Sequence, residues 1–246
     1  MFSNRYIFIY STVMVIIVAA LLSTTAMMLQ PLQEQNIAIA KIQGILASAD
    51  IESTADDAEE LYKDAIKEEL IIDPEGNVIS LYKNGAFETG EERAFDLNLK
   101  KELYNKKMGK PFKIPLYIAE IDGNITYIIP LLGKGLWGPV YGNIAFGTDF
   151  NKVVGADFGH DKETPGLGAE ISTKEFAAQF IGKSIFDANG NFVSIAVVKG
   201  GASTLPNDRQ IHGVDAVSGG TITSNSVTDM LDDCLENYVS YIKKNI

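Results

Sequence analysis

The feature that most constrains this chain is an uncharged apolar run near its N-terminus. No charged residue occurs from Tyr6 to Leu29, and the run consists mostly of Ile, Val, Ala, Leu and Met. Because an α-helix rises about 1.5 Å per residue, about 20 apolar residues span the roughly 30 Å hydrocarbon layer of a bilayer. The run therefore predicts a single membrane-spanning helix, followed by a domain outside the hydrocarbon.

A cleaved signal peptide is the alternative interpretation of this run. Its apolar part is typically about 7–15 residues long and ends at a small-residue cleavage site. The run here is longer, and the small residues at positions 23–26 lie inside it, so an anchor is favoured. Arg5 precedes the run and Glu34 follows it. The positive-inside tendency then places the N-terminus in the cytoplasm and the main domain outside.

Composition excludes several function classes. The net charge is −11, from 32 acidic and 21 basic residues, and an acidic surface repels nucleic-acid phosphates. Cys234 is the only cysteine, so the chain forms no internal disulfide and no cysteine-ligated iron–sulfur cluster. His160 and His212 are too few for a multi-haem or histidine-rich metal protein. We expect no nucleic-acid partner and no metal site.

We expect three parts: an anchor at residues 1–30, a stalk helix at 31–50 and an exterior domain at 51–246. Apolar residues continue at helical spacing to about Ala49, which predicts the stalk. An acidic helix is predicted from Asp56 to about Leu70. Its carboxylates suit the first turn of a helix better than a calcium loop, because no glycine bends the chain there.

Three strand–turn–strand units are predicted in the exterior domain, at residues 70–82, 115–132 and 185–198. Each turn places Gly beside Asn or Asp, which supplies the positive φ that tight hairpins need. A helix is expected at 173–181. No low-complexity linker divides the domain, so we predict one α+β domain of antiparallel sheets with flanking helices. These units build the fold and carry no chemistry.

The last helix has the clearest periodicity. Its apolar residues recur at three- and four-residue steps: Val227, Met230, Leu231, Cys234, Leu235, Tyr238 and Ile242. Cys234 lies on this apolar face, so we expect a core residue rather than a reactive thiol. Lys243 and Lys244 suit the C-terminal end of the helix dipole.

The segment before that helix is a candidate phosphate site. Gly219 and Gly220 are followed by hydroxyl residues at a helix start, where backbone N–H groups and the helix dipole attract a phosphate. Read alone, the segment is equally well a plain helix entrance, with Thr223 or Ser224 as the N-cap.

The same segment resembles a flavinylation motif, Asp-x-x-Ser/Thr-Gly-Ala-Thr. Asp215 and residues 218–221, Ser-Gly-Gly-Thr, match it, except that Gly220 replaces the usual Ala. The resemblance implies that a flavin transferase joins FMN through its phosphate to Thr221. Thr223 is the second choice of acceptor.

Two further segments resemble one family. Residues 133–142, Gly-Lys-Gly-Leu-Trp-Gly-Pro-Val-Tyr-Gly, are similar to a Gly-x-Gly-Leu-Trp-Gly segment in the C subunit of the sodium-translocating NADH:quinone reductase (the Nqr complex). Residues 163–168, Glu-Thr-Pro-Gly-Leu-Gly, resemble a loop shared by that protein and by the G subunit of the related Rnf complex. The Leu-Trp pair favours the Nqr family, and the Rnf relative is the alternative. The three motifs and the anchor cover nearly the whole chain.

The family resemblance implies an electron-carrying subunit that is not catalytically complete alone. Covalent FMN passes single electrons between redox centres, from NADH on a sister subunit towards quinone, while sodium is pumped elsewhere in the complex. The implied partners are the other Nqr subunits and a flavin transferase. The implied location is the bacterial inner membrane, with the main domain periplasmic. A membrane-tethered binding module without redox chemistry is an alternative from another class.

The residues at 133–138 also match Gly-x-Gly-x-x-Gly, a dinucleotide fingerprint. We reject nicotinamide binding, because that loop must open a helix, whereas Pro139 and a strand near Ile144 follow here.

The candidate site combines the acceptor with residues around the flavin ring. Leu136 and Trp137 suit apolar walls for the ring, with a buried core tryptophan as the alternative. Thr164 and Leu167 belong to a Pro-Gly loop whose backbone is expected to meet the polar edge of the flavin, with Glu163 and His160 favoured as holders of that loop. The full predicted set is Thr221, Ser218, Gly219, Gly220, Leu136, Trp137, Glu163, Thr164, Leu167 and Gly168.

Overall fold

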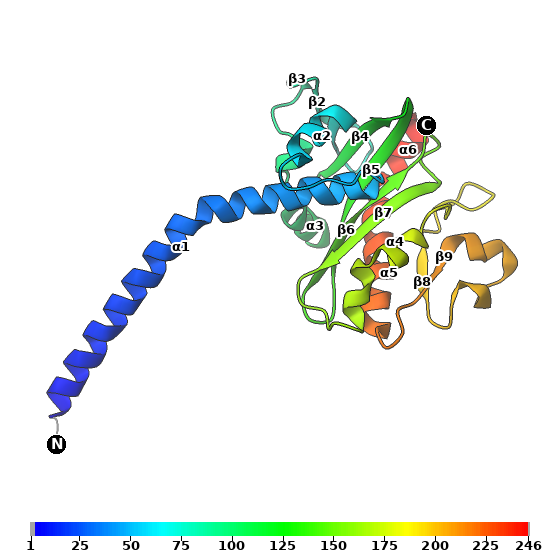
Figure 1. The fold of residues 1–246 in the computed structure, drawn as a ribbon. Coiled ribbons are helices and arrows are strands. Elements are labelled where there is room, and N and C mark those ends of the chain that lie inside the picture. Colours follow the sequence, from blue (N-terminus) through cyan, green and yellow to red (C-terminus); the bar gives the residue numbers. More distant parts are fainter. Residues whose placement is uncertain (1–2, 246) are drawn as a thin grey trace. The chain divides into compact units, whose positions relative to one another are not determined.

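The computed structural model describes residues 3–245 and divides the chain into two compact units, Met1–Lys41 and Ile42–Ile246 (Figure 1). Helix α1 (Asn4–Ser48) contains the predicted anchor and stalk without a break at residue 30, and it includes Pro31. Its most apolar 18-residue window has a mean hydropathy of 2.3. Within residues 3–245 it is the one helix long and apolar enough to cross a membrane.

The second unit is built on a seven-stranded antiparallel sheet in the order β3-β2-β1-β4-β5-β6-β7. The strands are β1 (Ile66–Ile72), β2 (Val78–Lys83), β3 (Ala86–Thr89), β4 (Ile114–Ile121), β5 (Asn124–Lys134), β6 (Pro139–Phe146) and β7 (Val153–His160). A separate pair, β8 (Ala196–Val198) and β9 (Gly213–Asp215), is parallel. The predicted α+β class with antiparallel sheets is confirmed.

The other elements are helices. The α-helices of the second unit are α2 (Ala58–Ala65), α3 (Leu99–Lys107), α4 (Lys174–Ala178), α5 (Thr221–Leu235) and α6 (Val239–Asn245). Short 3-10 helices occur at Ala94–Asp96, Gly168–Ser172, Ala202–Thr204, Asn207–His212 and Glu236–Tyr238. The helix predicted at 173–181 is α4, which is shorter than expected and has Thr173 as its N-cap. Among the described residues, no three His, Cys, Asp or Glu side chains form a metal-binding group.

Two of the three predicted hairpins are confirmed, as β1–β2 and β4–β5. The third, at residues 185–198, is confirmed only around its turn. Phe186 and Phe192 form an antiparallel bridge and Asp187 N donates to Asn191 O at 2.9 Å, but the chain after Val193 leaves for the parallel pair with β9. Ser194, with φ of 56°, breaks the extended backbone between the two segments.

One face of the sheet packs on the C-terminal helices. The predicted apolar residues of α5, including Met230, Leu231 and Cys234, are buried in the main core against strand residues such as Ile129 and Ile144. Burial raises the pKa of the Cys234 thiol to about 11, which keeps it protonated, in agreement with its predicted core role. The predicted last helix is interrupted by the 3-10 turn at Glu236–Tyr238 before α6.

The opposite face receives α2 and the last turns of α1. Residues on this face alternate along the strands with those of the main core. A Cβ built on Gly155 of β7 would lie 2.3 Å from the Ser48 carbonyl oxygen. A Cβ built on Gly44 would lie 3.1 Å from Asn143 Nδ2 and 3.2 Å from Asp157 Oδ2. Glycines on both partners therefore allow the end of α1 to approach β6 and β7 closely.

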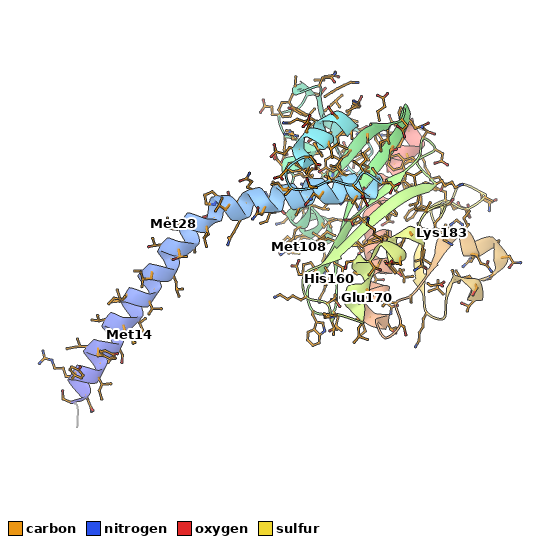
Figure 2. All side chains as sticks on the ribbon, viewed as in Figure 1. Met14, Met28, Met108, His160, Glu170 and Lys183 are labelled. Atoms are coloured by element: carbon orange, nitrogen blue, oxygen red, sulfur yellow. The ribbon has the colours of Figure 1, made fainter. Side chains whose placement is uncertain are left out.

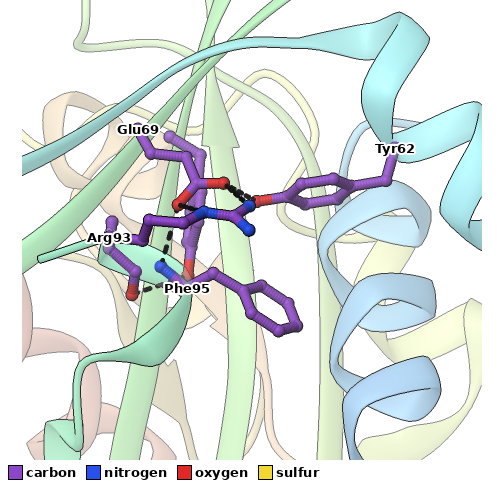
Figure 3. Close-up of polar contacts among 6 residues, drawn as sticks. Tyr62, Glu69, Arg93 and Phe95 are labelled. Carbon is purple, nitrogen blue, oxygen red and sulfur yellow. Dashed lines mark hydrogen bonds and ion pairs between the residues drawn. The ribbon is translucent and has the colours of Figure 1, made fainter. Parts of the chain in front are cut away.

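A buried ion pair anchors the loop after β3 on this same face (Figure 3). Glu69, 3% exposed, accepts hydrogen bonds from Arg93, from the Tyr62 hydroxyl at 3.0 Å and from Phe95 N at 3.0 Å.

Because Glu69 lies on a strand, the predicted end of the acidic helix is wrong. The acidic helix expected to reach Leu70 ends at Ala65, because residues 66–72 pair with both β2 and β4.

Replacing Gly155 by Ala is expected to destabilise the domain. The new methyl group meets a backbone oxygen that cannot move aside, and such overpacking typically costs about 1–3 kcal/mol. Gly147→Ala is the matched control, because its Cβ would meet nothing closer than 3.5 Å. Thermal unfolding of both variants checks this, and equal midpoints would contradict the close contact between β7 and α1.

Candidate functional site

Helix α5 begins with an open N-terminus. It starts at Thr221 with Gly220 as the N-cap, no side chain caps it, and its first backbone hydrogen bond runs from Ser224 N to Gly220 O at 2.8 Å. The amides of the first turn therefore lack intrahelical partners and favour an anion. The prediction of Thr223 or Ser224 as N-cap is wrong, because the helix starts earlier.

The hydroxyl groups of the first turn differ in their partners. Thr223 is 2% exposed, and its hydroxyl donates to Glu163 Oε2 at 2.7 Å. Ser224 Oγ accepts from Val217 N at 3.2 Å. Thr221 is half-buried, and its hydroxyl has no hydrogen-bond partner among residues 3–245. The first helical threonine is thus the one whose oxygen is available to a phosphate.

The Glu163 carboxylate joins the three segments singled out in the sequence. It is 4% exposed, and besides Thr223 it accepts from Trp137 N at 3.1 Å through Oε1. Its own backbone N–H donates to Nδ1 of His160 at 3.3 Å. His160, labelled in Figure 2, is the last residue of β7, which runs into this loop. These bonds give Glu163 and His160 the loop-holding role that we favoured, and a contact of Glu163 with a cofactor stays a prediction.

The electrostatics of Glu163 follow from its hydrogen bonds. Burial opposes ionisation of the carboxyl, but the hydrogen bonds from the Thr223 hydroxyl and from the amides of Trp137 and Leu136 outweigh it. They hold the pKa of Glu163 below its usual 4.5. The group therefore stays a buried, fully ionised acceptor at neutral pH.

Three glycines of the predicted motifs are required by close contacts around this carboxylate. A Cβ on Gly168 would lie 2.3 Å from Thr223 Oγ1, and a Cβ on Gly135 would lie 2.6 Å from Glu163 Oε1. Gly219 has φ of +74°, and its Cβ would lie 2.5 Å from Leu167 Cδ2. A side chain at any of these positions would clash, so the 163–168 loop touches the helix entrance directly and the 133–142 segment approaches Glu163 closely.

Exposed apolar side chains belong to the same segments. Trp137 is 63% exposed, Leu136 46% and Leu167 42%. A buried core tryptophan, the alternative for Trp137, is therefore wrong. Ile222, next to Thr221, is 56% exposed and was missed by the sequence analysis, because a lone Ile between two threonines carries no motif. Such uncovered apolar groups suit a flat aromatic ligand.

The backbone of the Pro-Gly loop is more occupied than expected. The Thr164 carbonyl accepts from Leu167 N and Ala169 N, both at 3.1 Å, and Gly166 N donates to Glu170 Oε1 at 2.8 Å. These groups hold the loop together and are not available to a ligand. The predicted contact of Thr164 with the flavin then has to be made by its exposed side chain.

The dinucleotide interpretation is excluded by the local structure, as predicted. Gly133 lies at the end of β5, a turn closes with Gly135 N donating to Gly138 O at 2.8 Å, and β6 begins at Pro139. No helix follows these glycines, so a pyrophosphate would find no helix N-terminus there.

An open helix N-terminus, a free threonine hydroxyl beside it and uncovered apolar side chains define a site that fits a phosphorylated aromatic cofactor. The family model described as FMN-binding domain matches residues 135–236, which include both loops and the helix entrance. The fold and the site thus define an FMN-binding-domain protein that begins with an apolar helix of membrane-spanning length.

Relatives identify the family more closely. The C subunit of the Na(+)-translocating NADH-quinone reductase from Vibrio parahaemolyticus is 31% identical, over 88% of this chain and 85% of the relative. The same protein from Vibrio anguillarum is 33% identical, over 88% and 84%. The chain belongs to the family formed by the C subunit of the Na(+)-translocating NADH-quinone reductase, which confirms the resemblance.

Solved structures agree with this assignment. The crystal structure of this family member from Parabacteroides distasonis is 37% identical, with a TM-score of 0.74 over 87% of this chain and 96% of that one. Shewanella oneidensis NqrC, 24% identical, has a TM-score of 0.67 over 85% and 98%, and it supports the fold.

Replacing Glu163 by Gln is expected to loosen the junction of the three segments. A hydrogen bond to a charged group contributes about 1.5–3 kcal/mol, so a loss of about 1–2 kcal/mol in unfolding free energy is expected. The emission of Trp137, the only tryptophan, should also shift, because its amide loses a charged acceptor. The exposed Glu120→Gln is the control.

The pH dependence of the same variant has a definite sign. Because the pKa of Glu163 is depressed in the folded state, its stabilisation is present at neutral pH and is lost as pH falls below about 4.5. Glu163→Gln should lack this part of the acid destabilisation. If the unfolding free energies of variant and wild type fall equally as the pH drops below 5, the Glu163 charge does not contribute to the acid destabilisation.

Proposed function

We propose that this chain carries FMN on Thr221, joined through the FMN phosphate, and acts as a one-electron carrier of a Na(+)-translocating NADH-quinone reductase. The observation that carries the proposal is the free Thr221 hydroxyl at the open N-terminus of α5. A phosphoester at Thr221 Oγ1 keeps the phosphate beside the first-turn amides, whose partial charges stabilise it. The neighbouring Thr223 hydroxyl is already bonded to Glu163.

The chain's own residues then bind and orient the ring. FMN supplies the redox chemistry when it is attached. Leu136, Trp137 and Leu167 offer apolar surface, and removal of that surface from water favours a stacked flat ring. The buried Glu163 carboxylate holds the loops that carry these side chains. A flavin transferase installs the cofactor.

The chain is proposed to work only within the complex. Electrons enter from NADH and leave towards quinone through other subunits. The predicted span contains no ionisable side chain other than Tyr6 and Tyr10, so sodium passes elsewhere.

Thr221→Ala is expected to abolish covalent flavin. Produced together with a flavin transferase, the wild-type chain should gain the mass of FMN minus water, and the variant should gain nothing. Thr221→Ser should keep the modification, because it retains the hydroxyl. Mass spectrometry and flavin fluorescence of the denatured chain measure both.

Ser203→Ala serves as the control and should remain modified, since the exposed Ser203 lies in the 3-10 helix Ala202–Thr204, outside the motif. Full modification of Thr221→Ala, or its transfer to Thr223, would disprove Thr221 as the acceptor. A wild-type chain without bound flavin would instead support the non-redox binding module.

Trp137→Ala and Leu167→Ala are expected to keep covalent FMN but change its spectrum and midpoint potential. An aromatic contact is worth about 1 kcal/mol, which corresponds to about 40 mV for one electron if it favours one redox state. Spectroelectrochemistry of the attached flavin measures this. An unchanged spectrum and potential in both variants would remove these residues from the ring site.

The main domain is proposed to lie outside the inner membrane, in the periplasm, with the N-terminus in the cytoplasm. The support is the single Arg5 before the span and Glu34 after it. Protease added to cells with a permeabilised outer membrane should digest residues beyond Leu29. Protection of the domain under these conditions would place it in the cytoplasm instead.

A further inference from the structure

A pocket lies at the β7 edge of the sheet, formed by residues that the proposed flavin site does not use. Its volume is about 600 Å³, and it is bordered by the end of α1, the segment 50–57, β7 and α4. The methyl groups of Ala47, Ala156 and Ala177 contribute apolar wall. The pocket belongs wholly to the second unit.

Asp157 is the unusual residue of this pocket. It is half-buried, and its Oδ2 faces Gly44 of α1. Among the described residues, its carboxylate makes no hydrogen bond or ion pair, and its oxygens remain accessible to solvent. Burial alone raises its pKa to about 6, with no neighbouring positive charge to lower it. A carboxylate in this position weakens the isolated fold at neutral pH.

The other charged groups of the pocket do not compensate Asp157. Glu52 and Lys174 pair with each other at 2.5 Å on the exposed rim. Asp57 Oδ1 accepts from Thr54 N at 2.6 Å, and Asp50 is exposed. The pocket therefore has four carboxylates and one lysine, and that lysine already has a partner.

We propose that this pocket receives a Lys or Arg side chain from another subunit of the reductase complex, with its ammonium or guanidinium group paired to Asp157. The inference rests on the proposed function only in requiring that complex. The pocket's excess of negative charge complements a cation, and its alanine walls suit the aliphatic stem of such a side chain. Pairing satisfies the carboxylate, and the positive charge opposes the effect of burial on its pKa.

A metal ion is a poorer occupant. Hard cations take about six to eight oxygen ligands, and among the described residues no group of three acidic or histidine side chains gathers closely enough to hold one. The apolar methyl groups that line the pocket also suit a hydrocarbon stem better than a hydrated ion.

The test is Asp157→Asn in the intact complex. The complex is purified through another subunit and washed with rising NaCl, and the amount of this chain that remains is measured. Loss of the pair should release the variant at lower salt, with an apparent affinity at least tenfold weaker. Asp208→Asn removes the same charge from an exposed site on the 3-10 helix Asn207–His212 and should be retained like the wild type.

In the isolated chain, removal of the Asp157 charge should increase stability, whereas in the complex it should weaken binding. Because the folded-state pKa of Asp157 is raised, its destabilising effect grows as pH rises from about 4 to about 6. Asp157→Asn should therefore unfold at a higher temperature than the wild type at pH 7, and at nearly the same temperature at pH 4. Asp157→Ala provides a second variant that removes the charge and should be released from the complex in the same way.

Equal retention of the Asp157 variants and the wild type in the complex would overturn the proposal. If agmatine then binds saturably to the wild type but not to Asp157→Asn, the pocket is a small-amine site instead. Flavin attachment should be unchanged in these variants. Failure of the Thr221 test together with loss of the Asp157 variants from the complex would refute the flavin proposal alone.

Discussion

The candidate site depends on one buried carboxylate, which accepts hydrogen bonds from two other segments of the chain. Glu163 binds Trp137 N through one oxygen and the Thr223 hydroxyl through the other. Segments separated by 26 and 60 residues are thereby held at one point. Because a buried carboxylate left without its donors is costly, the two loops and the helix entrance stabilise one another. The glycines at 135 and 168 make the approach sterically feasible.

The two faces of the sheet pack against different helices. The face against α5 fixes the helix whose first residue is Thr221, through buried residues such as Met230 and Leu231. The other face receives the end of α1 and α2 and contains the Glu69–Arg93 pair. The pocket beside Asp157 is also lined by Ser172 and Thr173, which follow the loop that contains Glu163, so a change at this pocket reaches the helix entrance through that loop as well as through the sheet.

Much of the fold was predictable from local signals. The Asp/Asn-Gly turns located the β1–β2 and β4–β5 hairpins, and apolar periodicity located α5. The failures have local physical causes: Ser194 breaks the third hairpin, and strand pairing on both sides converts residues 66–69 from helix to strand. The motifs named three segments that meet at Glu163. Their convergence on Glu163 and the difference between the Thr221 and Thr223 hydroxyls depend on contacts across 60 residues, which no local pattern contains.

The β6–β7 hairpin has a mechanical consequence. Its open end carries the Trp137 and Glu163 loops, while Gly155, in the middle of β7, touches the Ser48 carbonyl of α1. Five residues of strand, about 17 Å at about 3.3 Å per residue, join that contact to His160. Because β6 and β7 belong to the seven-stranded sheet, the two loops at the open end of the hairpin are joined to the contact with α1 by continuous hydrogen-bonded strand.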